Sequence, residues 1–348
     1  MKKILTVYTG GTIGCAPADG QRELNTELAK RYIALRFSQS DSQYASIGHS
    51  LFEDSCLTHQ TLSENMTLSK LQGIIDHLRS FDLERYAGVM IMHGTDTLAY
   101  TASLLSMLLC DAPVPVMLVS GAKPPMVEGT NANANFRAAA ELILGGIAPN
   151  VYVPYMSSDG VMRLHTGSRL LQSANFSEDF VSAGESWVVS DDNTRLLSRA
   201  KELSSARQKS PYASDLGLHS GLLSLAPYTG LDYSRIPLNG IKAVVHGTYH
   251  SGTFCVGRSD EESPYGAGSV LHLAARGKTR NIPIFAAPCQ LDEEQYSSVF
   301  DGVKNGGLIP LNMTNECACM KALLGISNGL GGTELTEYMR APLNNEII

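Results

Sequence analysis

The 348-residue sequence lacks several features, and each absence argues against a class of protein. No run of Lys or Arg forms a basic stripe, and a formal net charge of -7 with a pI near 5.7 argues against a nucleic-acid-binding groove. No stretch approaches the ~20 apolar residues that cross a bilayer. The seven cysteines are scattered and odd in number, so they form no disulfide framework. We therefore expect small-molecule chemistry in the cytoplasm, with no nucleic-acid or membrane partner.

Motifs for cofactors and metals are also missing from the sequence. Neither G-x-G-x-x-G nor the P-loop pattern with its lysine is present. Cys317-Ala318-Cys319 lacks the second ligand pair of a zinc site, so these cysteines are expected to be small buried side chains. The sequence thus predicts neither a cofactor nor a metal.

Apolar runs of strand length alternate with helical patterns through the first half of the chain. This alternation is typical of a parallel sheet covered by crossover helices. Helical spacing indicates helices over residues 68–78, 98–109 and 133–144. The pattern predicts an α/β fold whose larger N-terminal domain has a mostly parallel, flavodoxin-like sheet, with strands at Ile4–Tyr8, Ala87–Met92, Val114–Val119 and Val151–Tyr155.

The chain then changes in composition before the same rhythm returns. Residues 196–218 are mostly polar and broken by Ser-Ser, Lys-Ser-Pro and Ser-Asp, which predicts a linker. We therefore expect an N-terminal domain over residues 1–195 and a smaller C-terminal α/β domain over residues 219–348. Its expected elements are strands at Lys242–Val245 and Ile282–Ala286 and a helix at Glu316–Leu324.

Two threonine-bearing loops follow two of the predicted strands. One is Thr9-Gly10-Gly11-Thr12-Ile13, and the other is His93-Gly94-Thr95-Asp96-Thr97. The carboxyl ends of parallel strands are where open sheets bind ligands. Taken singly, the first loop could be a tight turn or a phosphate cradle, and Asp96 could cap a helix. Together they indicate a threonine nucleophile with a Thr-Asp partner.

These two loops resemble the active-site signatures of the bacterial-type L-asparaginases, in particular their cytoplasmic type I branch. Ser120-Gly121-Ala122, Ile241-Lys242-Ala243 and Met313-Thr314-Asn315-Glu316 extend the resemblance over nearly the whole chain. The resemblance implies hydrolysis of L-asparagine to L-aspartate and ammonia by double displacement. It also implies a homodimer or homotetramer with sites between the domains of paired subunits.

The resemblance assigns roles to individual residues. Thr12 is the expected nucleophile, supported by Thr95, Asp96 and a lysine. Ser63 is expected to hold the substrate α-carboxylate, and Asp96 also to face its α-amino group. Backbone N–H groups of the glycine loops would stabilise the oxyanion. The further substrate contacts implied are Gly11, Gly94 and Ala122.

The sequence departs from this family pattern around the nucleophile. Arg169 stands at our placement of the lysine, and a guanidinium holds charge but is a poor proton shuttle. Lys123 could supply the missing ammonium from another loop, or could be a surface lysine before a Pro-Pro turn. The mobile loop at Gly20-Gln21-Arg22 has no tyrosine, and Tyr32 is the next one along the chain.

Two further departures concern the substrate. Glu64 adds a negative charge beside Ser63, where the family has a neutral residue and the substrate backbone should lie. Thr253 replaces an asparagine that, in the family, reaches the site of the neighbouring subunit.

Three alternatives remain open. The chain could hydrolyse a different amide, such as glutamine, a D-amino acid or a modified or peptide-linked asparagine. It could be the asparaginase-like subunit of a tRNA-dependent amidotransferase, but we would then expect an extra N-terminal domain and a nucleic-acid surface. It could also be a binding or sensing protein that has lost turnover, although such a protein has no need of Thr12 with Thr95 and Asp96.

Overall fold

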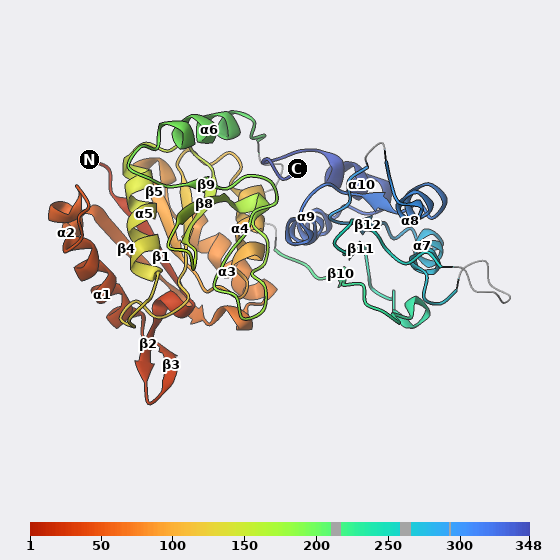
Figure 1. Cartoon of the computed structure of the whole chain (residues 1–348), viewed down its shortest axis with the longest axis horizontal. Coiled ribbons are helices and arrows are strands. Elements are labelled where there is room, and N and C mark those ends of the chain that lie inside the picture. Colours follow the sequence, from red (N-terminus) through yellow and green to blue (C-terminus); the bar gives the residue numbers. More distant parts are fainter. Residues whose placement is uncertain (210–216, 258–265, 292–293) are drawn as a thin grey trace. The chain divides into compact units, whose positions relative to one another are not determined.

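The computed structural model describes residues 1–209, 217–257, 266–291 and 294–348. The chain divides into two compact units (Figure 1). Unit 1 comprises Met1–Ser214 with Leu343–Asn345, and unit 2 comprises Asp215–Pro342 with Glu346–Ile348. Each unit contains its own parallel sheet, which confirms the predicted α/β class.

Unit 1 is built on a seven-stranded sheet. Its order is β4-β1-β5-β6-β7-β8-β9. The first five strands in this order, β4, β1, β5, β6 and β7, run parallel to one another. Numbered along the chain, these five strands follow the order 2-1-3-4-5, which is the flavodoxin-like order that we predicted. Strands β8 and β9 extend the sheet antiparallel. The bounds are β1 Ile4–Gly10, β4 Phe52–Thr61, β5 Gly88–Met92, β6 Val116–Val119, β7 Val151–Met156, β8 Met162–Thr166 and β9 Trp187–Val188.

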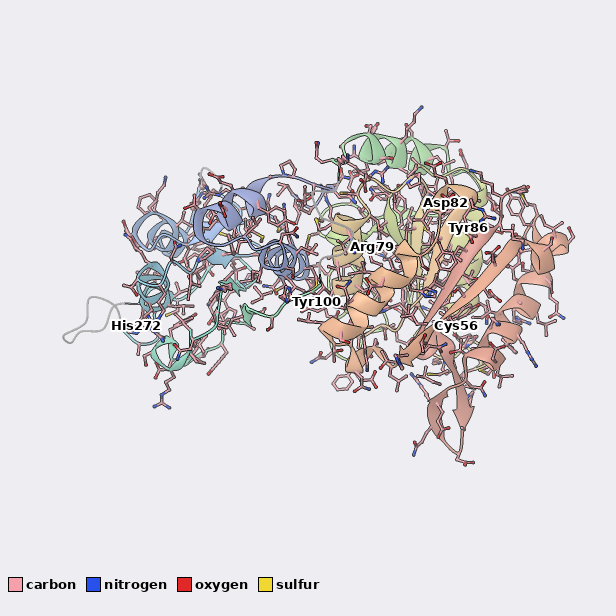
Figure 2. All side chains as sticks on the ribbon, turned by 180° about the vertical axis from the view of Figure 1, so that it is seen from behind. Cys56, Arg79, Asp82, Tyr86, Tyr100 and His272 are labelled. Carbon is pink, nitrogen blue, oxygen red and sulfur yellow. The ribbon has the colours of Figure 1, made fainter. Side chains whose placement is uncertain are left out.

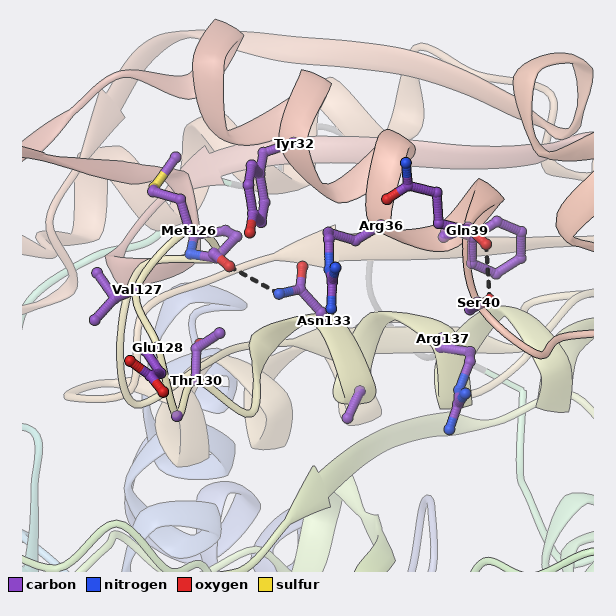
Figure 3. A pocket seen from close by; sticks show the side chains of 14 residues that line it. Tyr32, Arg36, Gln39, Ser40, Met126, Val127, Glu128, Thr130, Asn133 and Arg137 are labelled. Carbon is purple, nitrogen blue, oxygen red and sulfur yellow. Dashed lines mark hydrogen bonds between the residues drawn. The ribbon is translucent and has the colours of Figure 1, made fainter.

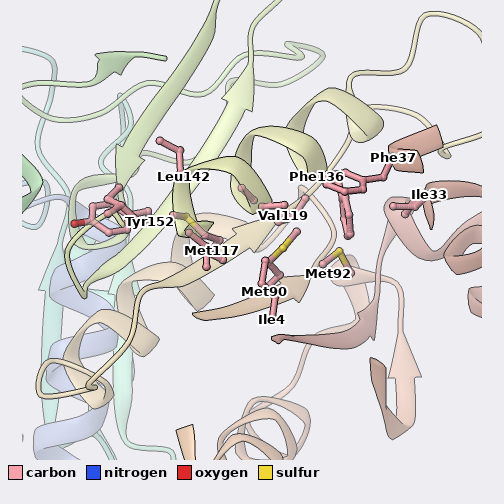
Figure 4. Packing of buried hydrophobic residues seen from close by; sticks show 14 of the residues in the cluster. Ile4, Ile33, Phe37, Met90, Met92, Met117, Val119, Phe136, Leu142 and Tyr152 are labelled. Carbon is pink, nitrogen blue, oxygen red and sulfur yellow. The ribbon is translucent and has the colours of Figure 1, made fainter. Parts of the chain in front are cut away.

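Helices cover both faces of this sheet, which is why every residue of β1 and β5 is buried. On one face, Ile4, Met90 and Met117 belong to a core cluster that also contains residues of α1, α5 and α6 (Figure 4). Helix α3 covers the opposite face, which Figure 2 shows from behind with Arg79 at the helix end. The bounds are α1 Thr26–Ser38, α2 Gly48–Leu51, α3 Leu68–Arg79, α4 Leu98–Leu108, α5 Ala132–Leu144 and α6 Thr194–Ser205.

Unit 2 has a four-stranded parallel sheet in the order β10-β11-β12-β13. Its interior holds a buried ion pair, in which Lys321 Nζ lies 2.6 Å from Glu346 Oε1 and both side chains are 0% exposed. The strands are β10 Leu222–Leu225, β11 Ala243–His246, β12 Ile284–Ala286 and β13 Ile309–Pro310. The helices are α7 Val270–Lys278, α8 Ser297–Phe300, α9 Asn315–Ser327 and α10 Gly332–Arg340.

The elements differ from the expected ones where polar residues dominate the sequence. The composition of residues 196–218 predicts a linker, whereas helix α6 continues through the first part of that stretch to Ser205. Leu196, Ala200 and Leu203 are buried at helical spacing, and the polar residues between them form the solvent-facing side. Strand β4 also went unpredicted, because its polar sequence lies at the sheet edge and is half exposed.

No helix in the described ranges combines the length and the apolar character that a membrane crossing demands.

Candidate functional site

The two threonine-bearing loops meet at the point where the strand order of unit 1 reverses. Strand β1 lies between β4 and β5, and the loops leave the carboxyl ends of β1 and β5. Gly11 and Gly94 are packed backbone to backbone, because a Cβ atom on Gly11 would lie 2.1 Å from the Gly94 nitrogen. Gly11 also has a φ of 71°, in the left-handed region that favours glycine. The topology and these glycines therefore bring Thr12 and Thr95–Asp96 into neighbouring loops.

Backbone and side-chain hydrogen bonds fix the first loop. The Gly11 N–H donates to the Thr61 carbonyl at 2.9 Å, and the Thr9 hydroxyl donates to the Met92 carbonyl at 2.7 Å. The Gly11 N–H is thus already used, so an oxyanion must be stabilised by other amides. Half-buried Thr12 begins the 3-10 turn Thr12–Gly14.

Cys15 is a further nucleophilic side chain near this loop. Its thiol donates weakly to the Gly11 carbonyl at 3.3 Å. Burial raises the pKa of the Cys15 thiol to about 11, so it stays protonated and weakly nucleophilic at neutral pH. Cys15 is also 0% exposed, whereas Thr12 is half-buried, so Thr12 is the more accessible candidate for the nucleophile.

Ser63 holds Asp96 through two hydrogen bonds. Its hydroxyl donates to Asp96 Oδ2 at 3.0 Å and accepts from the Asp96 N–H at 3.1 Å. Ser63 is only 3% exposed, whereas Asp96 is exposed. The helix-cap alternative for Asp96 is not observed, because the N-cap of α4 is Thr97, which makes no side-chain cap and donates to the Ser63 carbonyl. The Asp96 carboxylate is thus oriented by Ser63 rather than by a helix end.

His93 is buried and hydrogen-bonds to the second loop, a role that its position in the motif did not reveal. Its Nδ1 lies 2.8 Å from the Gly94 carbonyl, and its Nε2 lies 3.0 Å from the Thr101 hydroxyl. Because a carbonyl only accepts, Nδ1 carries the proton and Nε2 accepts from Thr101. Burial lowers the pKa of His93 to about 4, so the ring is neutral at physiological pH. His93 therefore fixes the Gly94 backbone and adds no charge to the site.

A cavity of about 390 Å³ opens beside Thr95, Asp96 and Ala122. Its remaining lining is Tyr155 and most of residues 172–180. From this segment Gln172 donates its Nε2–H to the Asp96 carbonyl at 2.8 Å. Gln172 was not a predicted site residue, and only the folded chain brings it next to a residue 76 positions earlier.

Arg169, our placement of the family lysine, belongs to the same segment but is not a lining residue of this cavity. Its Nε donates to the Asn345 carbonyl at 2.5 Å. The structure therefore brings Gln172, rather than Arg169, to the cavity wall.

The mobile-loop region is a hairpin of β2 (Cys15–Ala18) and β3 (Gln21–Leu24), which extends beyond the sheet in Figure 1. Arg22 on this hairpin donates to the Ala122 carbonyl at 3.2 Å, so an arginine joins the hairpin that follows the Thr12 loop to the segment Ser120-Gly121-Ala122. Tyr32 lies on α1 and lines a separate cavity of about 590 Å³, together with Arg36 and Arg137 (Figure 3). The nearest tyrosine along the sequence is thus part of another cavity.

The other predicted residues have less defined surroundings. Lys123 is half-buried, and its Nζ lies 3.6 Å from where a Cβ on Gly129 would be; it is not a lining residue of the Thr95–Asp96 cavity. Glu64 is exposed in the 3-10 turn Ser63–Asn65. Thr253 lies in a loop of unit 2, where its carbonyl accepts from the Tyr249 N–H at 2.9 Å.

Comparison with known proteins is consistent with this geometry. Residues 3–186 match the N-terminal domain model of the asparaginase family. L-asparaginase of Thermococcus kodakarensis is 31% identical over 196 residues, which cover 54% of this chain and 56% of that protein. L-asparaginase 1 of Escherichia coli K12 is 34% identical over 130 residues, 36% of each chain. The chain thus spans about half, or less, of the length of the curated relatives it matches.

Solved structures extend the likeness in fold to the whole chain. The thermostable L-asparaginase of Thermococcus kodakarensis superposes with a TM-score of 0.75 at 20% identity, covering 99% of both chains. L-asparaginase I of Vibrio cholerae gives a TM-score of 0.68 at 21% identity, covering 100% of this chain and 99% of the other. At such identities these structures establish the fold alone. Since the family model itself matches more than half of the sequence, the chain belongs to the asparaginase family.

Proposed function

We propose that this chain hydrolyses the side-chain amide of an amino-acid substrate, with L-asparagine as the default, and that Thr12 is the nucleophile. The observation that carries the proposal is the contact of the Gly11 and Gly94 backbones, which joins the Thr12 loop to the Thr95–Asp96 loop at the strand-order reversal. The names of the relatives, L-asparaginase in both Thermococcus and Escherichia, support the same reaction class.

The proposed reaction has two displacements. Thr12 Oγ attacks the amide carbon, the C–N bond breaks, and the nitrogen leaves as ammonia after gaining a proton. Water then attacks the resulting ester, which releases the carboxylic acid and restores the Thr12 hydroxyl. Asp96, oriented by Ser63, would bind the substrate ammonium group through its exposed carboxylate.

The surroundings of Thr95 and Asp96 predict slow turnover. Gln172 donates its amide N–H to the Asp96 carbonyl, and Arg22 donates to the carbonyl of Ala122, another lining residue of the cavity. Neither group gives up or takes a proton at ordinary pH. We therefore propose that Gln172 occupies the place of the family lysine and that proton transfer limits the rate.

Ammonia release from L-asparagine, L-glutamine, their D-forms and short asparagine peptides tests the proposal, with Thr12→Ala as the matched control. We expect release by the native chain and its loss in Thr12→Ala. Release that survives in Thr12→Ala would overturn the threonine mechanism. If no amide yields ammonia, the chain is instead a binding or sensing member of the family, which the presence of Gln172 and Arg22 would explain.

We further propose that the active form is a cytoplasmic homodimer or homotetramer in which Thr253 contacts the site of a neighbouring subunit. Support comes from the resemblance to type I enzymes and from a structural neighbour described as a probable cytoplasmic L-asparaginase of Campylobacter jejuni. Light scattering of the purified protein measures the assembly. A monomer that retains full turnover would contradict this proposal.

A further inference from the structure

The cavity beside Thr95 and Asp96 is larger than a free amino acid requires. It measures about 390 Å³, and this lies within the range of roughly 300–1,000 Å³ that encloses larger ligands. An amino acid of roughly nine non-hydrogen atoms, at no more than about 30 Å³ each, occupies at most roughly 270 Å³. Most of its lining comes from residues 172–180, which lie beyond the two signature loops in sequence. Neither Thr12 nor Ser63 lines this cavity, so an amino acid held against Thr12 leaves room in it for a second group attached to the amino acid.

An aromatic side chain stands fully exposed on this lining segment. Phe176 is 108% exposed and has a φ of 61°, a backbone conformation that is rare for a bulky residue. Strained backbone of this kind gathers at ligand-binding segments, where the surrounding structure holds it in place. Here the Ser173 hydroxyl donates to the Asp179 carbonyl at 2.8 Å, and Asp179 Oδ2 accepts from the Ser158 hydroxyl at 2.7 Å. These bonds tie together the two ends of the segment, and Phe176 lies between them in sequence.

Two further aromatic residues, Tyr155 and Phe180, line the same cavity. Tyr155 is fully buried and packs edge-on against Phe180, with ring centroids 4.9 Å apart and an interplanar angle of 71°. Aromatic rings in the lining of a cavity favour an apolar or aromatic guest. The exposed Phe176 ring would bury the most apolar surface when such a guest covers it.

Charge around the cavity opposes an anionic guest. Asp96 and Glu178 line it, and none of the described lining residues is Lys, Arg or His. Arg22 lies outside this lining and donates to the Ala122 carbonyl. Glu64 is also outside this lining, but it is exposed beside Ser63, where the resemblance puts the substrate α-carboxylate. These carboxylates suit an ammonium group and disfavour a free carboxylate.

We propose that the preferred substrate is an N-terminal asparagine of a short peptide, with a free ammonium group at Asp96 and an apolar or aromatic second residue against Phe176. A peptide bond removes the α-carboxylate charge that Glu64 and Glu178 would repel, and it leads the chain into the cavity. This inference rests on the proposed amide hydrolysis and names its substrate class.

The first test compares kcat/KM for free L-asparagine with that for Asn-Phe, Asn-Gly and Asn-Glu, each peptide closed by a C-terminal N-methylamide so that ammonia comes only from the asparagine side chain. We expect Asn-Phe to exceed both free asparagine and Asn-Glu. Phe176→Ala should lower the ratio of Asn-Phe to Asn-Gly by roughly 2- to 10-fold, the effect of losing one aromatic contact. Tyr228→Ala, an exposed aromatic of unit 2, is the matched control and should leave the ratio unchanged.

The second test separates this inference from the proposed reaction. Calorimetric titration of Thr12→Ala protein with Asn-Phe and Asn-Glu N-methylamides measures binding without turnover. Tighter binding of Asn-Phe, weakened in the double variant with Phe176→Ala, supports the inference even if no amide is hydrolysed. Asparagine binding or hydrolysis that exceeds that of every peptide overturns it and leaves the amide hydrolysis intact.

Discussion

Replacing Gln172 with lysine is the most informative perturbation of this site. The Gln172 amide nitrogen lies 2.8 Å from the Asp96 carbonyl, on a wall shared with Thr95. A lysine ammonium lies one bond, about 1.5 Å, further along the side chain. It would enter a cavity in which Asp96 and Glu178 supply negative charge and the described lining contains no other cation. Gln172→Lys therefore introduces a titrating donor where the native chain has a neutral amide.

A positioned proton-transfer group contributes about 10²- to 10⁴-fold to an enzymatic rate. At 1.36 kcal/mol per tenfold, this range corresponds to roughly 3 to 5 kcal/mol of activation free energy. We expect Gln172→Lys to raise kcat for asparagine by about 10²- to 10⁴-fold and to make kcat depend on pH as the lysine ammonium titrates. Steady-state ammonia release between pH 6 and 10 measures both effects.

Two variants serve as controls for this prediction. Gln172→Arg adds a charge that does not titrate and should raise kcat far less than lysine does. Arg169→Lys tests our original placement of the family lysine, and we expect little gain because Arg169 donates to the Asn345 carbonyl outside the cavity lining. A gain in Arg169→Lys with none in Gln172→Lys would refute the assignment of Gln172.

Three further outcomes are expected. Gly11→Ala should lower the free energy of unfolding by about 1–3 kcal/mol and abolish turnover, because its Cβ would overlap the Gly94 backbone. An unchanged urea unfolding midpoint together with native-like turnover would contradict this. Glu346→Ala should cost about 3–5 kcal/mol by leaving Lys321 buried without its carboxylate, and Glu202→Ala, an exposed ion-pair partner, is the control for the same denaturation assay. The free energy of unfolding should fall as the pH falls from about 6.5 towards 4, because the unfolded chain binds more protons than the folded chain in this range. At pH 5 each buried imidazole should lower it by roughly 2 kcal/mol. Equal melting temperatures at pH 5 and pH 7 would contradict this prediction. The three buried histidines concerned, each with its pKa lowered to about 4 by burial, are His93, His165 and His246.

The parts of the site that sequence reasoning reached are those encoded locally. A buried parallel strand is a continuous apolar run, and a glycine loop at its end is visible within a few residues. Strands β1 and β5 and the loops that carry Thr12 and Thr95–Asp96 were found in this way. Their proximity also followed from a general property of parallel sheets, in which carboxyl ends share one edge.

Side chains that come from distant segments could not be found by the same reasoning. Gln172 meets Asp96 across 76 positions, and Arg22 meets Ala122 across 100, so no local periodicity records either contact. Placing the family lysine by counting along the segment selected Arg169, whereas the turn after β8 directs that side chain to Asn345 and brings Gln172 to the cavity. A shift of three residues in a turn decides which side chain faces the site.

The sequence by itself determined the α/β class, the flavodoxin-like sheet and the two threonine loops, because apolar runs and glycines act over short distances along the chain. Only the tertiary structure decided what surrounds those loops. It oriented Asp96 through Ser63, placed neutral His93 beneath Gly94, and set Gln172 and the strained Phe176 along the cavity. These contacts depend on how far-separated segments pack, and packing is a property of the folded chain.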